Sequence, residues 1–323
     1  MIAGRYLAEC SREVFDDLEV HKYSLAEYRI SIYGRSRTEW HKLAKWWRTN
    51  KLQSPNVRWL IQVPRIYSVW KKIGMVGSFA DMLDNIFGPL FEATLDPLSE
   101  LNEDLTLFLN SVVGFDCVDD ESRPERVISG AQVPPTPEEW SSGDNPPYSY
   151  WTYYLYANIA TLNQLRSTRG LSTFSFRPHA GEAGDLNHLA SVFLTATGIN
   201  HGIQLRKSPV LQYLFYVTQI GIAMSPLSNN KLFLDFTRNP FHAFFKRGLN
   251  VSLSTDDPLM LHYTKVRRGV SPRSEQLRIY DSLRWYQRAR TSLTLLPRSP
   301  ALSGALPRAL PTVLPPMPAG TAC

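Results

Sequence analysis

Cysteine is scarce in this sequence, and the few that occur stand far apart. Cys10, Cys117 and Cys323 form no paired metal-ligand spacing. A disulfide framework and a cysteine-based zinc site are thereby excluded, because both need cysteines in spaced pairs. We expect reduced thiols without a functional role.

Long apolar runs are also missing. No stretch approaches the roughly 18 uninterrupted apolar residues that a membrane-spanning helix needs. Residues 1–9 are too short and too quickly acidic for a secretory signal peptide. The aromatic content of 12%, without overall enrichment of Gly and Pro, indicates a globular protein. We therefore expect a cytosolic protein without a membrane segment.

An excess of positive charge is absent from most of the chain. Residues 266–323 hold nine arginines, no lysine and two acids, whereas the other 265 residues hold 26 basic and 27 acidic side chains. A nucleic-acid-binding protein carries its positive charge on an ordered face, so we expect no nucleic-acid partner. The same terminal segment contains 8 of the 23 prolines. We predict a folded domain over 1–265 and a disordered Arg/Pro-rich tail over 266–323.

Short apolar or β-branched runs alternate with longer amphipathic stretches from Ala26 onward. This alternation is typical of α/β proteins, in which helices connect the strands of a parallel sheet. The predicted strands are 27–33, 57–63, 113–118, 173–177, 197–200, 222–225 and 250–254, and predicted helices include 38–49, 150–168 and 209–219. Seven such units predict a (β/α)8 barrel of the TIM type that is one strand short.

Polar side chains follow three of the later predicted strands. They are His179 and Glu182 after the fourth run, His201 after the fifth, and Asp256 and Asp257 after the seventh. Barrel enzymes keep their catalytic groups at these strand ends. Taken singly, each has an ordinary explanation as a structural histidine or a turn. Together, imidazole and carboxylate groups suit a zinc ion that activates water, with neighbouring groups to move protons.

Three motifs at these strand ends carry a family resemblance. His-Ala-Gly-Glu at 179–182, His-Gly at 201–202 and Ser-Thr-Asp-Asp-Pro at 254–258, in this order, resemble the adenosine and AMP deaminase superfamily. Further segments narrow the resemblance to AMP deaminases, with plant-type members the most similar. They are ISIYGR (30–35), SPNVRW (54–59), GFD (114–116), VDDES (118–122), KSPVLQYL (207–214) and MSPLSNN (224–230). The likeness runs from about Gly4 to Lys265.

The resemblance implies a function and a role for each motif residue. It implies zinc-dependent hydrolysis of AMP to IMP and ammonia in purine nucleotide metabolism, by a protein that forms homo-oligomers. His179 and Asp256 would bind Zn²⁺. Glu182 would contact purine N1 as the general acid, and His201 would orient or deprotonate the attacking water. Asp257 would hold that water and the purine edge, and the substrate-binding segment would continue through Pro258, Leu259 and Met260.

The sequence departs from the family pattern at two places. The family's other two zinc ligands are a His-x-His pair on the first barrel strand, and no His-x-His occurs among the seven histidines. The resemblance therefore implies that the first strand is missing, and we expect these 323 residues alone to bind zinc weakly and to deaminate AMP poorly. The second departure is Met260, where the family generally has Gln; beyond Lys265 the Arg/Pro-rich segment replaces the family's C-terminal region.

Two alternative functions stay open on the sequence. The chain could be a catalytically inactive family fragment with a role in assembly or regulation. It could also be an adenosine deaminase, which the AMP deaminase-like segments disfavour. His188 lies on a helix-like stretch with no partner that the sequence identifies, and we interpret Trp46, Trp47 and the aromatic residues of 150–156 as packing residues.

Overall fold

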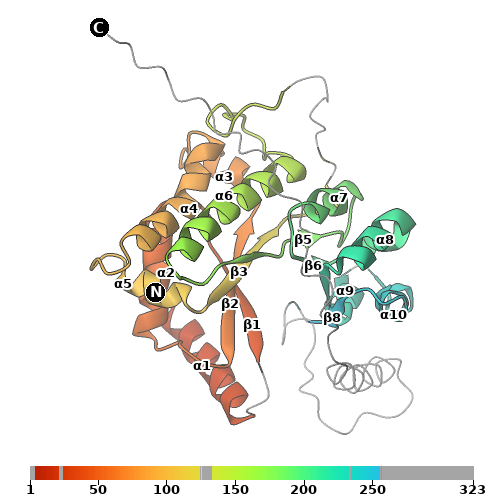
Figure 1. Ribbon diagram of the computed structural model, residues 1–323, viewed down its shortest axis with the longest axis horizontal. Coiled ribbons are helices and arrows are strands. Elements are labelled where there is room, and N and C mark those ends of the chain that lie inside the picture. The colour runs from red at the N-terminus through yellow and green to blue at the C-terminus, as the bar shows by residue number, and fades with distance from the viewer. Residues whose placement is uncertain are drawn as a thin grey trace. The chain divides into compact units, whose positions relative to one another are not determined.

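The computed structural model describes residues 4–21, 25–123, 125, 133–232, 234–254 and 256. These residues lie in one compact unit bounded by Met1 and Thr264 (Figure 1). The predictions for the tail at 266–323, and those for Asp257, Pro258, Leu259 and Met260, lie outside the described residues.

Helices and strands alternate along most of the chain. The strands are β1 (Ala26–Ser31), β2 (Val57–Pro64), β3 (Val112–Val118), β4 (Ser175–Phe176), β5 (His179–Ala180), β6 (Gly198–His201), β7 (Gly221–Met224) and β8 (Val251–Leu253). The α-helices are α1 (Arg5–Val20), α2 (Glu39–Thr49), α3 (Tyr67–Lys72), α4 (Phe79–Leu95), α5 (Glu103–Leu109), α6 (Tyr148–Thr168), α7 (Asn187–Phe193), α8 (Pro209–Thr218), α9 (Pro226–Leu232) and α10 (Phe241–Lys246). Two short 3-10 helices, η1 (Ile203–Lys207) and η2 (Phe236–Arg238), complete the described elements.

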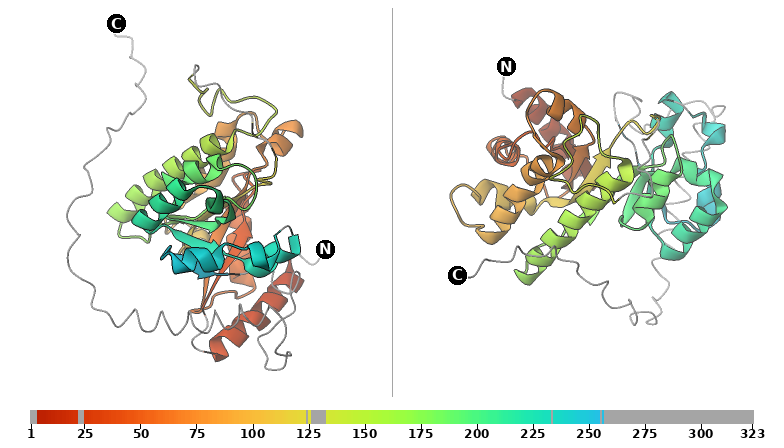
Figure 2. Two further views of the ribbon diagram at one scale, coloured as in Figure 1. Left: turned by 90° about the vertical axis from the view of Figure 1, so that its right-hand side faces the viewer. Right: turned by 90° about the horizontal axis from the view of Figure 1, so that it is seen from above.

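The strands form two four-stranded parallel sheets in chain order, β1-β2-β3-β4 and β5-β6-β7-β8. A mixed α/β fold with parallel strands is thereby confirmed, and each predicted strand overlaps an observed one. Figure 2 shows the helices on the outside of the strands. Among the described residues, the four strands β1, β4, β5 and β8 each pair on one side only. The closed eight-stranded barrel therefore stays a prediction.

The fourth predicted strand, 173–177, corresponds to β4 alone, and β5 is a separate short strand directly after it that the sequence did not predict. Pro178 lies between them and has no backbone N–H to give to a ladder. The next donor, the backbone N–H of His179, bonds the carboxylate of Asp116 at 3.0 Å, so it does not bond a strand carbonyl. As a result β4 pairs with β3, while β5 pairs with β6. The break places His179 at the point where the two sheets meet.

The crossover helix α8 shows why local sequence predicted the helices well. The hydroxyl of Ser208 accepts the backbone N–H of Leu211 at 3.3 Å, and Pro209 occupies the first helical position. Ser is a favoured N-cap and Pro suits the first turn. The helix ends where Gln219 adopts a left-handed φ of 54°. The prediction for 209–219 is confirmed to within one residue.

Aromatic side chains form much of the core. Trp40, Trp47 and Trp151 are buried, and Trp47 of α2 packs edge-on against Phe108 of α5 with 5.4 Å between ring centroids. The predicted packing role is confirmed for Trp47 and Trp151, whereas Tyr153 stays exposed on α6. None of the helices in the described ranges combines the length and apolar character required to cross a bilayer.

Candidate functional site

The predicted site residues gather at the carboxyl ends of the strands. His179 begins β5 and Glu182 follows it, His201 ends β6, and Asp256 follows β8. Because β5 to β8 are parallel and neighbours in one sheet, their carboxyl ends lie on the same edge. The structure therefore brings these four residues to one end of the sheet.

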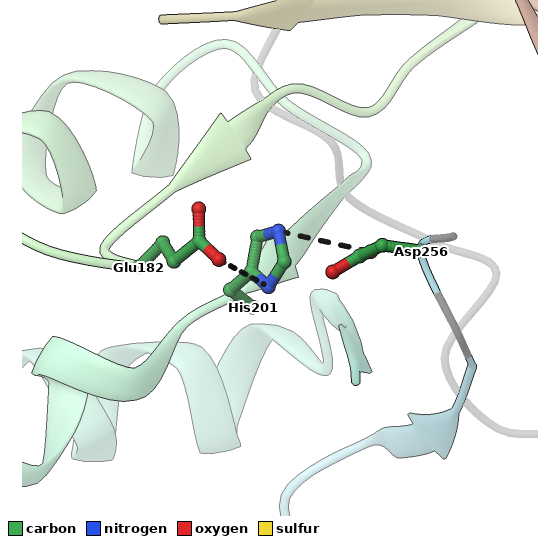
Figure 3. Close-up of side chains that lie close together, drawn as sticks. All are labelled: Glu182, His201 and Asp256. Atoms are coloured by element: carbon green, nitrogen blue, oxygen red, sulfur yellow. Dashed lines mark ion pairs between the residues drawn. The ribbon is translucent and has the colours of Figure 1, made fainter. Parts of the chain in front are cut away.

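Glu182, His201 and Asp256 form a group that can hold a metal ion. One ligand atom from each lies within 4.8 Å of the others. The Nδ1 atom of His201 is 3.5 Å from Oε1 of Glu182, and its Nε2 atom is 4.0 Å from Oδ1 of Asp256 (Figure 3). His201 also has a left-handed φ of 69°. Such backbone is uncommon outside glycine and tends to occur at functional sites.

His179 lies beside this group without belonging to it. Its ring centroid is 5.0 Å from that of His201, and its Nδ1 atom is 2.8 Å from Oδ1 of Asp116. A carboxylate at Nδ1 favours the tautomer that carries the proton there, which leaves Nε2 as the nitrogen that a metal can bind. Metal-binding histidines in proteins usually have such a carboxylate partner. Asp116 lies in the Gly-Phe-Asp segment at 114–116, and the local sequence indicates no role for it.

Asp116 is a buried carboxylate held on several sides. Its side chain is fully shielded, and Oδ2 accepts Nε of Arg29 at 2.8 Å. Burial works against the charged form, but His179 and Arg29 outweigh it and lower the pKa of Asp116 below its ordinary value. Arg29 also donates to Oδ1 of Asn200 at 2.7 Å, and thereby ties β1 to β6. A charged Asp116 is therefore available to orient His179.

The site contains one carboxyl group and one imidazole whose pKa values are shifted in opposite directions. Burial raises the pKa of Glu182 to about 7, against the opposing effect of the nearby His179. Burial also holds the pKa of His201 well below its ordinary value, and His179 acts in the same direction. Near neutral pH, Glu182 can therefore give up a proton while His201 is uncharged. Groups with such perturbed pKa values in one site are typical of acid–base catalysis.

The segment at 224–230 supplies polar contacts that sequence reasoning did not assign. Nδ2 of Asn229 donates to Oε1 of Glu182 at 3.2 Å, and the hydroxyl of Ser225 donates to Oδ1 of Asp256 at 3.0 Å. The hydroxyl of Ser228 accepts the backbone N–H of Asp256 at 3.2 Å. Oδ1 of Asn229 is buried and has no hydrogen-bond partner within the described ranges. These contacts hold the carboxylates of Glu182 and Asp256 in place, and they leave Oδ1 of Asn229 as an acceptor for a ligand.

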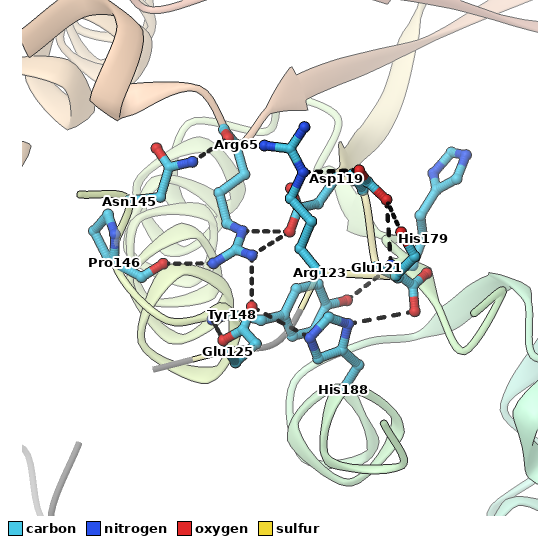
Figure 4. Close-up of polar contacts among 12 residues, drawn as sticks. Arg65, Asp119, Glu121, Arg123, Glu125, Asn145, Pro146, Tyr148, His179 and His188 are labelled. Carbon is cyan, nitrogen blue, oxygen red and sulfur yellow. Dashed lines mark hydrogen bonds and ion pairs between the residues drawn. The ribbon is translucent and has the colours of Figure 1, made fainter. Parts of the chain in front are cut away.

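His188 has partners that the sequence did not identify. Its ring stacks on Tyr148 with 3.9 Å between centroids, and Nδ1 lies 3.3 Å from Oε2 of Glu121. On its other side, Nε2 lies 3.3 Å from Oε1 of Glu125 (Figure 4). Burial alone would lower the pKa of His188, but the two carboxylates raise it to about 9. A charged imidazole thus lies beneath the loop that carries Glu182.

Comparison with known proteins identifies the family of the chain. The family model described as AMP deaminase matches residues 1–268. Over 265 residues the chain is 59% identical to a probable AMP deaminase of Oryza sativa subsp. japonica, 60% to AMP deaminase of Arabidopsis thaliana and 55% to AMP deaminase 3 of Homo sapiens. These matches cover 82% of the chain and 32%, 31% and 34% of the respective relatives.

The chain thus spans about a third of the length of the curated relatives that it matches. Among solved structures, the apo form of the N6-methyl-AMP deaminase from Arabidopsis thaliana aligns with a TM-score of 0.44 and 14% identity, over 77% of this chain and 61% of that one. The match to the family model covers more than half of the chain. The chain belongs to the AMP deaminase family.

Proposed function

We propose that the chain forms part of the active site of a zinc-dependent AMP deaminase. The overall reaction adds water at C6 of the purine and breaks the C6–N bond, giving IMP and ammonia. The observation that carries the proposal is the grouping of Glu182, His201 and Asp256 at one end of the parallel strands, in a chain of this family. Such strand ends are where barrel enzymes place their catalytic residues.

The side chains present are suitable for zinc. Imidazole nitrogens and carboxylate oxygens are its usual ligands beside thiolates. His179 and Asp256 would hold the ion, and the contact of His179 with Asp116 supports the first of these assignments. A bound zinc ion supplies Lewis-acid activation of water near neutral pH.

Each remaining side chain has a defined task in this proposal. Glu182, with its pKa near 7, donates a proton to purine N1 and makes C6 more electrophilic. His201 stays uncharged beside Asp256 and orients the attacking water. Asp257, with the substrate-binding segment Pro258, Leu259 and Met260, would contact the purine.

Several broader expectations belong to the same proposal. The protein would close an eight-stranded barrel, act in purine nucleotide metabolism, form a homo-oligomer and work in the cytosol. These statements stay predictions.

Substrate choice tests the function directly. We expect the zinc-loaded full-length protein to form IMP and ammonia from AMP with a kcat/KM at least about 100-fold higher than for adenosine, since a site built to bind phosphate discriminates strongly against its loss. The measurement is steady-state kinetics on both substrates with ammonia release as the readout. A preference for adenosine, or no turnover of AMP, would contradict the proposal.

A further inference from the structure

A buried carboxylate supports the loop that carries Glu182. Glu121 follows β3, and its side chain is almost fully shielded from solvent. Its Oε2 atom accepts the backbone N–H of Gly181 at 2.7 Å, and Oε1 faces the backbone N–H of Glu182 at 3.3 Å. Both oxygens of one carboxylate thus hold consecutive amides of the catalytic loop.

The backbone of Glu121 also contacts this loop closely. Gly184 has a left-handed φ of 66°, and a Cβ placed on it would lie 1.9 Å from the carbonyl oxygen of Glu121. Only glycine permits this approach. Glu121 therefore contacts the loop at both ends, through its side chain at Gly181 and Glu182 and through its backbone at Gly184.

The carboxylate of Glu121 also contacts a histidine that is itself held in place. Oε2 of Glu121 lies 3.3 Å from Nδ1 of His188, whose ring stacks on Tyr148 (Figure 4). The hydroxyl of Tyr148 donates to the carbonyl oxygen of His179 at 2.5 Å. One connected set of contacts therefore runs from His179, the first residue of β5, to Glu182 in the loop.

We propose that Glu121 is a positioning residue, whose carboxylate fixes the backbone of Gly181 and Glu182 so that the Glu182 side chain points at the reacting purine. The inference rests on the proposed function, since it assigns a task to Glu182. Geometry of this kind matters for rate because a displacement of about 1 Å can cost on the order of 100-fold in turnover. Glu121 acts through the loop and does not touch the substrate.

The chain offers a matched control. Glu125 contacts the same histidine at 3.3 Å, but among the described residues its other contacts are to Arg65 and to the backbone N–H of Tyr148, not to the catalytic loop. Glu121→Gln replaces one acceptor by an amide donor that faces a backbone N–H. Glu125→Gln removes an equivalent charge next to His188 and leaves the loop amides paired.

Hydrogen exchange reports on the loop independently of activity. We expect the amides of Gly181 and Glu182 to exchange at least about tenfold faster in metal-free Glu121→Gln than in the parent, because their shared acceptor is lost. Glu125→Gln should leave this exchange within about threefold of the parent. Unchanged exchange in Glu121→Gln overturns the inference. If Glu121→Gln does not fold, Glu121→Asp is the second variant. Its carboxylate is one methylene shorter and lies farther from the loop amides, so faster exchange of Gly181 and Glu182 is again expected.

Kinetics then separate positioning from general damage. We expect Glu121→Gln to lower kcat about 10- to 100-fold with a KM for AMP within about threefold of the parent. In a Glu182→Gln background the same change should cost less than about threefold, because both act on one step. Additive losses overturn the inference. Parental kcat in Glu182→Gln alone instead overturns the acid assigned in the proposed function, and the exchange experiment still decides whether Glu121 holds the loop.

Discussion

Glu182 lies where two roles compete, proton donor and metal ligand. Its carboxylate is within reach of His201 and Asp256, and burial raises its pKa to about 7. A metal ligand is needed to retain the ion, whereas a general acid is needed only for turnover. The two roles therefore differ in what a substitution removes.

Glu182→Gln distinguishes these roles in the full-length protein. The amide keeps the shape of the side chain and loses the transferable proton, so we expect kcat to fall about 10²- to 10⁴-fold with zinc content nearly unchanged. The measurements are kcat for AMP and metal analysis after dialysis. Turnover within about tenfold of the parent would remove the acid role, and loss of zinc would make Glu182 a ligand.

The ligand positions make a complementary prediction. His179→Ala and Asp256→Ala should each lose zinc on dialysis, because removal of one ligand leaves a weakly chelating site. Asp116→Asn keeps all proposed ligands but weakens the partner of His179, so we expect zinc affinity to fall about 10- to 100-fold only. The readout is zinc affinity by competition with a chelator. Stoichiometric zinc in either alanine variant would mean that the site has been misplaced.

At the scale of elements, the buried His188 on α7 makes folding stability depend on pH. Its pKa of about 9 lies above the ordinary value of 6.5, so the folded state binds the proton more tightly. The resulting stabilisation is complete below pH 6.5 and is lost as the pH rises through about 9. It amounts to at most about 3 kcal/mol.

His188→Gln tests this dependence. The variant should be less stable than the parent near pH 6, and the difference should shrink as the pH approaches 9.5. Free energies of unfolding from urea titrations at several pH values provide the measurement. A parent whose stability does not decline over this range, or a variant that declines equally, would contradict the assignment.

Local sequence patterns predicted elements well where the pattern itself determines the structure. The helix at 209–219 begins at a Ser-Pro pair, with Ser208 as its N-cap, and the strands are short apolar runs bounded by turns. The division between β4 and β5 was not predicted because it depends on the contact of His179 with Asp116, 63 residues away. The contact between His188 and Glu121 spans 67 residues. Such pairs are set by the packed fold and leave no local signal.

The sequence predicted some residues of the candidate site and missed others. His179, Glu182, His201 and Asp256 were found because each stands in a short motif directly after a strand. Asp116 lies near the end of β3 and Glu121 directly after it, but an isolated acid at a strand end indicates no partner. The signal that could have identified them was the position of β3 next to β4, the strand that directly precedes His179.

At the scale of the whole molecule, the ligand set is the limiting feature. The sequence contains no His-x-His pair, and a catalytic zinc site normally needs three protein ligands. A polypeptide of these 323 residues alone is therefore expected to bind zinc weakly and to deaminate AMP far below about 1 s⁻¹. Metal analysis and an ammonia-release assay on that polypeptide provide the check. One tightly held zinc per chain with ordinary turnover would show that another group completes the site.

The location of the metal in the full-length protein is the most direct test of the account. We predict that anomalous scattering measured at the zinc absorption edge will show one peak between the side chains of His179 and Asp256. Nε2 should be the ligating nitrogen of His179, because Nδ1 faces Asp116. A peak elsewhere, or a zinc ion held by Glu182 with His179 unbound, would contradict the account.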